Sequence, residues 1–457
     1  MVFRASEVVV ASNQALSNYP GTNSCLSNAS ISQGCFNSFV SELSSRAFRR
    51  PVTGGELDDL VNALWDTSLG KNEQIQTAFV AITQSPDFLY KAFDRGLAVP
   101  GEQNTLAMTS HELAAKVSFL LTGEPPDDEL RGLANSGQLS DANILDQQLD
   151  RLLNSQGAQR MIQRLFRESY GYDYFNSFDF SANFRGSISL SGLQNAMTNE
   201  LDNYFSTLVV DQNANFETLM TSRHSSVNNG SLAEIYGVSN GNNIQLPQSR
   251  AGFLNRAAML SKRSGSRTSP IKRGLAVLEH VLCVDVGLPP PSAPTSLPVL
   301  GGQALTTRQT TEQTSEVPNT SCVTCHSRMN PLGYAFENFD SLGRVRSQEA
   351  LYDTNDNVQT YLNLNTNMST SELSSGAQEF RDSQELVSGL GQSDRAKICF
   401  VKHLKKFESR GPASAGDYCQ MNEVLSTVYG SQQGQPGTIK DAIKALVNSS
   451  NFQKWSY

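Results

Sequence analysis

The chain has 457 residues, a formal net charge of −8 at pH 7 and a hydrophobic fraction of 38%. This length accommodates roughly two to four domains with sizeable cores. The acidic balance argues against broad non-specific binding of nucleic acid, and no apolar run is long enough for a membrane-spanning helix. We therefore expect neither nucleic acid as a partner nor a transmembrane segment.

Apolar residues recur at helical spacing through the N-terminal half. Residues 36–47 form one such stripe, and Thr53 followed by Glu56 is a capping box that opens the next helix. Thr109 and Glu112 repeat this capping pattern. Further amphipathic stretches cover residues 75–82, 144–166 and 193–209. These patterns predict consecutive helices and few strands.

The second half is less regular. Ser269 and Pro270 are predicted to be the N-cap and first residue of a helix. The Pro-rich run 288–298 is predicted to be a stiff extended connector, because proline cannot continue a helix. An irregular polar segment is expected from about 347 to 383, and helices are expected near 394–407 and 438–447. The fold class predicted from the whole chain is mostly α and multidomain.

Four of the seven cysteines are spaced for local disulfides. Cys25 and Cys35 lie close together in a Ser/Asn/Gly-rich loop, and Cys399 and Cys419 flank a Gly/Pro/Ser loop. Both pairings would fit an oxidising compartment. Cys283 is left over; it is predicted to be a small buried hydrophobe, with a reactive thiol or an intermolecular bridge as the alternative.

The remaining cysteines belong to the pentapeptide Cys322-Val323-Thr324-Cys325-His326. Two thiols three residues apart on one side of a helical turn can form thioether bonds to the vinyl groups of a porphyrin, and the adjacent imidazole can bind the iron. A lone CxxC would also suit zinc or a redox dithiol, but the immediate histidine and the lack of a second CxxC favour haem. The motif predicts one covalent haem c with His326 as its proximal ligand.

Residues after the motif are predicted to complete the haem pocket. The carbonyl of Pro331, five places after His326, could accept the imidazole N–H and fix the ring. Tyr334 and Phe336, with Leu332 and Phe339, would supply apolar surface against the macrocycle or simply belong to the core. Pro331, Tyr334 and Phe336 are therefore candidate cofactor-binding residues.

The second axial ligand is less well specified by the sequence. Met368, about forty residues after the motif, is spaced as in small c-type cytochromes, although it could equally be an exposed loop methionine. His111 is expected at the surface, His280 partly buried and His403 on a solvated basic helix, so bis-histidine ligation is disfavoured. An open or water-ligated iron is the remaining alternative.

Positive charge concentrates between residues 256 and 273. The basic residues there are expected on a solvated helix surface, with pairing to haem propionates or guidance of a redox partner as the alternative. They are Arg256, Lys262, Arg263, Arg267, Lys272 and Arg273.

Several segments resemble an uncharacterised planctomycete-type family of multidomain c-type cytochromes, also found in marine proteobacteria and myxobacteria. CVTCHSRMNPLGYAFENFDSLGRVR resembles its haem-bearing domain, and SSRAFRRPVTGGELDDL resembles its first helical domain. HELAAKVSFLLTGEPPDDEL and RTSPIKRGLAVLEHVLC resemble its middle domain, and CFVKHLKKFESRGPASAGDYC its C-terminal domain. The expected divisions are an N-terminal helical domain (1–100), a large helical middle domain (101–287), a Pro-rich linker with a small cytochrome c-like haem domain (288–384), and a C-terminal helical domain (385–457).

The resemblance also bears on location and ligation. Members are exported, whereas MVFRASEVVV lacks the features of a signal peptide, so we expect a periplasmic or extracellular protein whose export signal has been removed. Longer relatives carry an extra domain before this region, which suggests that the chain is a fragment. Many relatives also have a histidine shortly before CxxCH, where this chain reads TEQTSEVPNTSC.

The sequence thus predicts an exported mono-haem c-type cytochrome that transfers single electrons to or from a redox partner protein, rather than a catalyst. One alternative is a peroxidase- or oxidase-like enzyme acting at an open haem iron, associated with polysaccharide breakdown. The other is a structural surface protein in which haem staples a small domain.

Overall fold

The computed structural model describes residues 25–26, 28–90, 94–175, 178–261, 265–289, 304–353, 357–411, 417–430 and 436–456. The chain divides into two compact units, one formed by residues 1–152 with 447–457 and the other by residues 153–446. Of the predicted Pro-rich connector (288–298), residues 290–298 lie outside the described residues. Within the described part, no helix is both long enough and apolar enough to span a bilayer.

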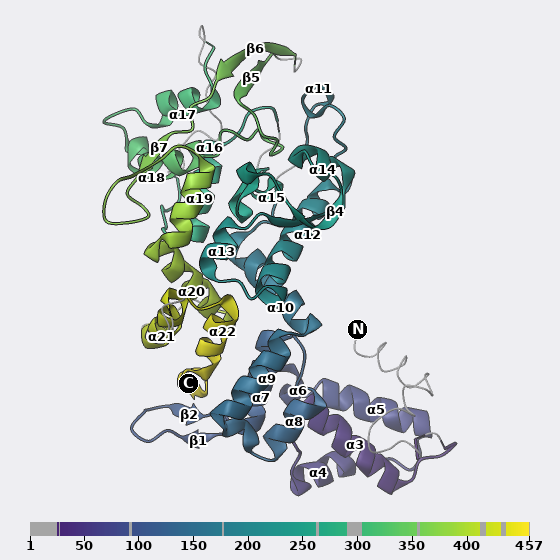
Figure 1. Ribbon diagram of the computed structural model, residues 1–457. Helices are drawn as coiled ribbons and strands as arrows, with labels where there is room; N and C mark the ends of the chain where they lie inside the picture. Colours follow the sequence, from purple (N-terminus) through teal and green to yellow (C-terminus); the bar gives the residue numbers. More distant parts are fainter. Residues whose placement is uncertain are drawn as a thin grey trace. The chain divides into compact units, whose positions relative to one another are not determined.

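The first unit consists mainly of short helices (Figure 1). The first of these helices, up to Ile82, surround a small apolar core. Both predicted capping boxes are present, with Thr53 and Thr109 as the N-caps, and the predicted Cys25–Cys35 disulfide is confirmed. A three-stranded antiparallel sheet in the order β1-β2-β9 brings the end of the chain back to this unit. Its elements are α3 (Gln33–Ala47), α4 (Gly54–Leu64), α5 (Lys71–Thr83), α6 (Pro86–Leu89), β1 (Leu97–Ala98), β2 (Thr105–Ala107), α7 (Ser110–Leu121), α8 (Asp128–Asn135), η1 (Gln138–Ser140), α9 (Ala142–Leu153) and β9 (Lys454–Ser456).

The second unit begins with helices that pack through aromatic rings. Phe166 of α10 stacks on Phe205 of α12, with ring centroids 4.2 Å apart. A buried ion pair, Arg256 to Glu200 at 2.8 Å, joins two of its segments. The elements are α10 (Gln156–Tyr170), α11 (Ala182–Arg185), α12 (Leu193–Ser206), η2 (Thr207–Asp211), α13 (Phe216–Thr221), β3 (His224–Val227), α14 (Gly230–Tyr236), β4 (Gly241–Gln245), η3 (Gln248–Arg250), η4 (Phe253–Asn255) and α15 (Ala257–Leu260).

The rest of the second unit carries the CxxCH motif. Ser269 and Pro270 open α16 as predicted, and α16 packs against α18, the helix that contains the motif (Figure 1). The elements are α16 (Pro270–Ala276), η5 (Val277–Val281), α17 (Thr307–Ser315), α18 (Ser321–Tyr334), β5 (Gln348–Tyr352), β6 (Val358–Asn363), β7 (Met368–Thr370), β8 (Gln378–Phe380), α19 (Ser383–Gln392), α20 (Asp394–Ser409), α21 (Tyr418–Tyr429) and α22 (Ile439–Asn448).

The mostly helical fold class is confirmed, but two local predictions are wrong. The segment expected to be irregular contains two antiparallel pairs, β5–β6 and β7–β8, whose strands of three to six residues are too short to give a clear alternating signal. Cys399 pairs with Cys283 instead of Cys419, across 116 residues, and Cys419 is free and exposed. Closeness in sequence does not predict the disulfide partner here, because Cys399 is buried in α20 and Cys283, just after η5, packs against it.

Candidate haem-attachment site

The CxxCH motif occupies the first turns of α18. Cys322 is exposed, Cys325 is half-buried, and both thiols are free. Because the cysteines are separated by almost one helical turn, both sulfurs belong to the same side of the helix. The Cys325 Sγ lies 3.8 Å from the carbonyl oxygen of Val286, in the stretch that follows Cys283. The two thiols are therefore accessible near the N-terminal end of a well-formed helix.

The position of α18 depends on two glycines. A Cβ added at Gly333 would lie 1.9 Å from the carbonyl oxygen of Pro270, and one added at Gly274 would lie 1.8 Å from that of Met329. Backbone of α16 therefore contacts backbone of α18 directly at this crossing, which only residues without a side chain permit. The crossing fixes the C-terminal half of the motif helix against the rest of the unit.

A buried ion pair holds the turn that follows α18. Arg273 lies 3.3 Å from an oxygen of Glu337, and both side chains are buried. The same guanidinium donates to the carbonyls of Phe336 at 2.8 Å and Phe339 at 3.0 Å. Burial lowers the pKa of Arg273 to about 10 and raises the pKa of Glu337. The expectation of a solvated basic surface is thus wrong for Arg273, because burying the charge is compensated by these bonds.

The other members of the predicted basic cluster differ in environment. Arg256 is also buried, in its pair with Glu200, whereas Lys272 is exposed. Lys262 and Arg263 lie outside the described residues. Charge alone could not separate these cases, because burial depends on a distant carboxylate.

The imidazole of His326 is oriented by Asn330. Its Nδ1 lies 3.1 Å from Asn330 Oδ1, one helical turn further along the same face. Asn330 is buried, and its Nδ2 donates to Ser315 Oγ at 3.0 Å and to Glu316 Oε1 at 2.8 Å. With the amide N–H groups committed to these acceptors, Oδ1 must accept from the imidazole. The proton of a neutral His326 therefore sits on Nδ1, and the lone pair of Nε2 can face a metal.

The predicted partner of this imidazole was the carbonyl of Pro331. Pro331 instead lies inside α18, where backbone carbonyls run parallel to the helix axis, and the Asn330 side chain occupies the position beside Nδ1. The sequence signal for Asn330 is its spacing of four residues from His326 within a helix.

Glu316 extends this network to Tyr334. The Tyr334 hydroxyl donates to Glu316 Oε1 at 2.6 Å, and burial together with this carboxylate raises the Tyr334 pKa. The guanidinium of Arg308 in α17 lies 4.4 Å from the centroid of the Tyr334 ring. Arg308 Nη1 also donates to the carbonyls of Asn365 at 2.9 Å and Asn367 at 2.7 Å. The network thus runs from His326 to the segment just before Met368.

Met368 is buried, with 6% of its surface exposed, and it opens β7, which packs against α18. Glu372, two residues after the end of β7, forms a bidentate ion pair with Arg328 of α18, with N–O distances of 2.6 and 3.1 Å. Arg308 and Arg328 therefore hold the two ends of the strand that begins with Met368. The alternative of an exposed loop methionine is wrong, because β7 is a paired strand bound to the motif helix.

These residues fit a haem c. Two free thiols are correctly spaced, a histidine presents Nε2, and buried hydrogen bonds fix its ring.

Three family models match separate stretches of the chain. PSCyt3, a protein of unknown function (DUF1588), matches residues 250–349, including the motif. PSD4 (DUF1592) and PSD5 (DUF1595), both also proteins of unknown function, match residues 108–238 and 35–92. The chain carries a PSCyt3 domain.

PSCyt3 is the cytochrome-like member of a planctomycete-type set of domains, so the resemblance seen in the sequence is confirmed at the level of this set. The search of curated proteins and the search of solved structures gave no match. The region matched to PSCyt3 contains the α16–α18 crossing, His326, Asn330 and Glu316, whereas Met368 lies beyond it.

Tyr334 and Phe336 of the PSCyt3 domain are buried, as are Leu332 and Phe339. They were expected either to face the macrocycle or to form ordinary core, and their burial agrees with both. Their contact with a haem, like that of Pro331, stays a prediction. Asn330, Glu316 and Arg308 are the residues that reasoning from the sequence missed; two of them lie before the motif, where no spacing rule connects them to it.

Proposed function

We propose that the protein is an exported mono-haem c-type cytochrome that transfers single electrons. The observation that carries this proposal is the geometry of the motif: free thiols at Cys322 and Cys325 beside a histidine whose Nδ1 is bonded to a buried amide. The PSCyt3 match to the same region supports it. The two disulfides are consistent with an extracytoplasmic location, where haem attachment to CxxCH takes place.

Each residue of the site has a distinct role in this proposal. Haem c supplies one-electron exchange between ferric and ferrous iron. Cys322 and Cys325 tether it through thioethers, and His326 Nε2 is the proximal ligand. Asn330 holds the imidazole in one tautomer and raises its basicity as a ligand. Met368, on a strand fixed to α18, is the proposed second ligand.

A pyridine haemochrome spectrum of the protein, produced in a host that matures c-type cytochromes, tests the proposal. We expect one haem c per chain. Replacing both motif cysteines (Cys322→Ala with Cys325→Ala) should abolish covalent haem, whereas Cys419→Ser, which removes a free exposed thiol elsewhere, should leave it intact. Absence of c-type bands from the unaltered protein would refute the proposal, as would haem that persists covalently in the double variant.

Electron transfer is tested separately from haem attachment. Stopped-flow mixing of the reduced holoprotein with a one-electron acceptor such as ferricyanide should give rapid, complete oxidation without consumption of peroxide or oxygen. A peroxidase-like enzyme would instead turn over peroxide with many equivalents of an organic donor. That outcome would replace electron transfer by catalysis at an open iron.

A further inference from the structure

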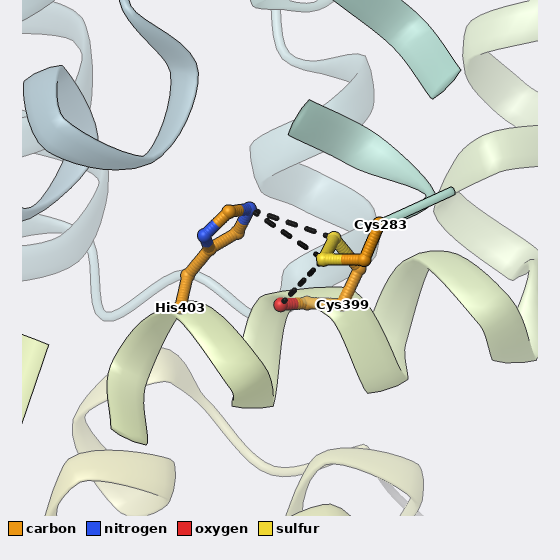
Figure 2. Close-up of side chains that lie close together, drawn as sticks. All are labelled: Cys283, Cys399 and His403. Atoms are coloured by element: carbon orange, nitrogen blue, oxygen red, sulfur yellow. Dashed lines mark hydrogen bonds between the residues drawn. A yellow bond between two sulfur atoms is a disulfide. The ribbon is translucent and has the colours of Figure 1, made fainter. Parts of the chain in front are cut away.

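A second chemical cluster lies in the same unit, at the disulfide between Cys283 and Cys399 (Figure 2). His403, one turn after Cys399 on α20, points its ring at the two sulfur atoms. Its Nε2 lies 3.5 Å from Cys399 Sγ and 4.0 Å from Cys283 Sγ. The expectation that His403 belongs to a solvated face is wrong, because Cys399 and His403 share the side of α20 that meets the end of η5.

The protonation state of His403 follows from its surroundings. Nε2 lies 2.8 Å from the carbonyl oxygen of His280, so this nitrogen carries the hydrogen. Burial lowers the His403 pKa to about 4, which keeps the ring neutral near pH 7. The disulfide therefore has an N–H donor beside it, and the sulfur nearer to that donor is Cys399 Sγ.

The two sulfurs differ in access. Cys283 is half-buried and lines a cavity of about 520 Å³, whereas Cys399 is completely buried. Lys402 and Lys406 line the same cavity, together with Glu168 and Glu279. Cys283 also has a φ of +50°, a left-handed backbone conformation that is unusual for a residue other than glycine. Backbone strain of this kind is relieved more easily once the covalent link is open.

We propose that Cys283–Cys399 is a thiol–disulfide exchange site that accepts a thiolate from the cavity. The incoming thiolate forms a sulfur–sulfur bond with Cys283, and the bond between Cys283 and Cys399 breaks. Cys399 leaves with the electron pair as a thiolate. A second thiolate then attacks the mixed disulfide, which gives an external disulfide and a thiolate at Cys283. In total the protein disulfide is reduced to two thiols while two external thiols are oxidised.

The surroundings match this direction of attack. The His403 N–H is placed to donate to the thiolate that forms on Cys399, and a charged sulfur is a stronger acceptor than the carbonyl of His280. Lys402 and Lys406 offset the charges of Glu168 and Glu279 in the cavity, so its lining carries no net negative charge that would repel a thiolate next to Cys283. Attack at Cys399 would require access to a fully buried atom.

The chain provides its own control for a test. The Cys25–Cys35 disulfide also joins a half-buried cysteine to a buried one. Among the described residues, however, a histidine lies in a group with both sulfurs of a disulfide only at Cys283–Cys399. The haem-loaded protein is treated with dithiothreitol, quenched with an alkylating agent at intervals, and mapped by mass spectrometry. We expect Cys283–Cys399 to open about tenfold faster than Cys25–Cys35, roughly the effect of one hydrogen bond to a charged leaving group.

Variants assign the roles. His403→Leu should slow opening about tenfold, and His403→Gln, which returns a donor, should restore part of the rate. With reduced and oxidised glutathione, Cys399→Ser should form a mixed disulfide at Cys283, while Cys283→Ser should leave Cys399 unmodified. Equal rates for the two disulfides together with an unchanged rate in His403→Leu would identify a purely structural bridge and overturn the proposal. The His403 variants retain the disulfide, so the test holds even if a serine variant does not fold.

Discussion

Replacing the two glycines at the α16–α18 crossing tests whether direct backbone contact positions the motif helix. Gly333→Ala would place a methyl carbon 1.9 Å from the Pro270 carbonyl, and Gly274→Ala would place one 1.8 Å from the Met329 carbonyl. Ordinary contact begins at 3.4 Å, so either substitution requires the helices to separate by about 1.5 Å. Both neighbours are backbone atoms, which cannot rotate away as a side chain could.

The expected cost of each single substitution is about 3 kcal/mol of unfolding free energy, at the upper end of the range for overpacking a dense core. Replacing glycine by alanine within a helix returns less than about 1 kcal/mol. The double variant should cost little more than either single variant, because one separation of the helices accommodates both methyl groups. We therefore expect a coupling energy of about 2 kcal/mol between the two sites.

Urea unfolding followed by circular dichroism gives the four free energies of this double-mutant cycle. Gly132→Ala is the matched control, because Gly132 lies within a helix, α8, and an added Cβ there has no neighbour within 4 Å. It should be neutral or slightly stabilising. If the two crossing substitutions cost under about 1 kcal/mol each, or if their effects simply add, the crossing does not position α18 as described.

Three further predictions concern the histidines and the proposed axial ligand. Asn330→Ala should leave haem attached but raise the midpoint potential, because the imidazole loses the hydrogen bond that makes it a stronger donor to ferric iron. A spectroelectrochemical titration measures the potential, and an unchanged value would argue against the Asn330 bond. Met368→Ala should convert a low-spin ferric haem into one that binds cyanide rapidly. Met329→Leu, which alters a comparably buried methionine, should leave cyanide binding slow. Identical cyanide kinetics in the two variants would exclude Met368 as a ligand. The pKa of His403 falls from 6.5 to about 4 on folding, so between these pH values the unfolded state binds a proton that the folded state does not. The free energy of unfolding should therefore decline by about 3 kcal/mol as the pH falls from 6.5 to 4. His403→Asn should remove this part of the pH dependence, and parallel stability curves for variant and parent would contradict the assignment.

Local signals in the sequence predicted the helical part of the fold well. The capping boxes at Thr53 and Thr109 and the N-cap at Ser269 lie where the structure begins its helices, because their hydrogen bonds involve residues only three positions apart. The strands β5 to β8 are not evident in the sequence because their stability comes from pairing and, for β7, from contact with α18. An isolated short strand carries little periodic signal of its own.

In the candidate site, too, local features are predictable from the sequence and long-range contacts are not. The CxxCH pentapeptide is recognisable because its chemistry depends on spacing within one helical turn. The Cys283–Cys399 disulfide and the Arg273–Glu337 pair join positions 116 and 64 residues apart, and nothing in their neighbourhoods names the partner. Glu316 is a similar case, since its role depends on the turn between α17 and α18 that carries it to Asn330 and Tyr334.

The closeness of Cys325 to Val286 has a consequence for biogenesis. Val286 is three residues from Cys283, so at most about 11 Å of extended chain separates the cysteine of the long-range disulfide from the residue that the motif thiol contacts. In an oxidising compartment a nascent chain could join Cys283 to Cys325 and thereby block thioether formation. Packing of α20 against η5 places Cys283 at Cys399, so in the folded protein Cys283 is paired and the motif thiols are free. If the motif attaches haem as proposed, closing the Cys283–Cys399 bond before attachment would keep Cys283 from competing for Cys325.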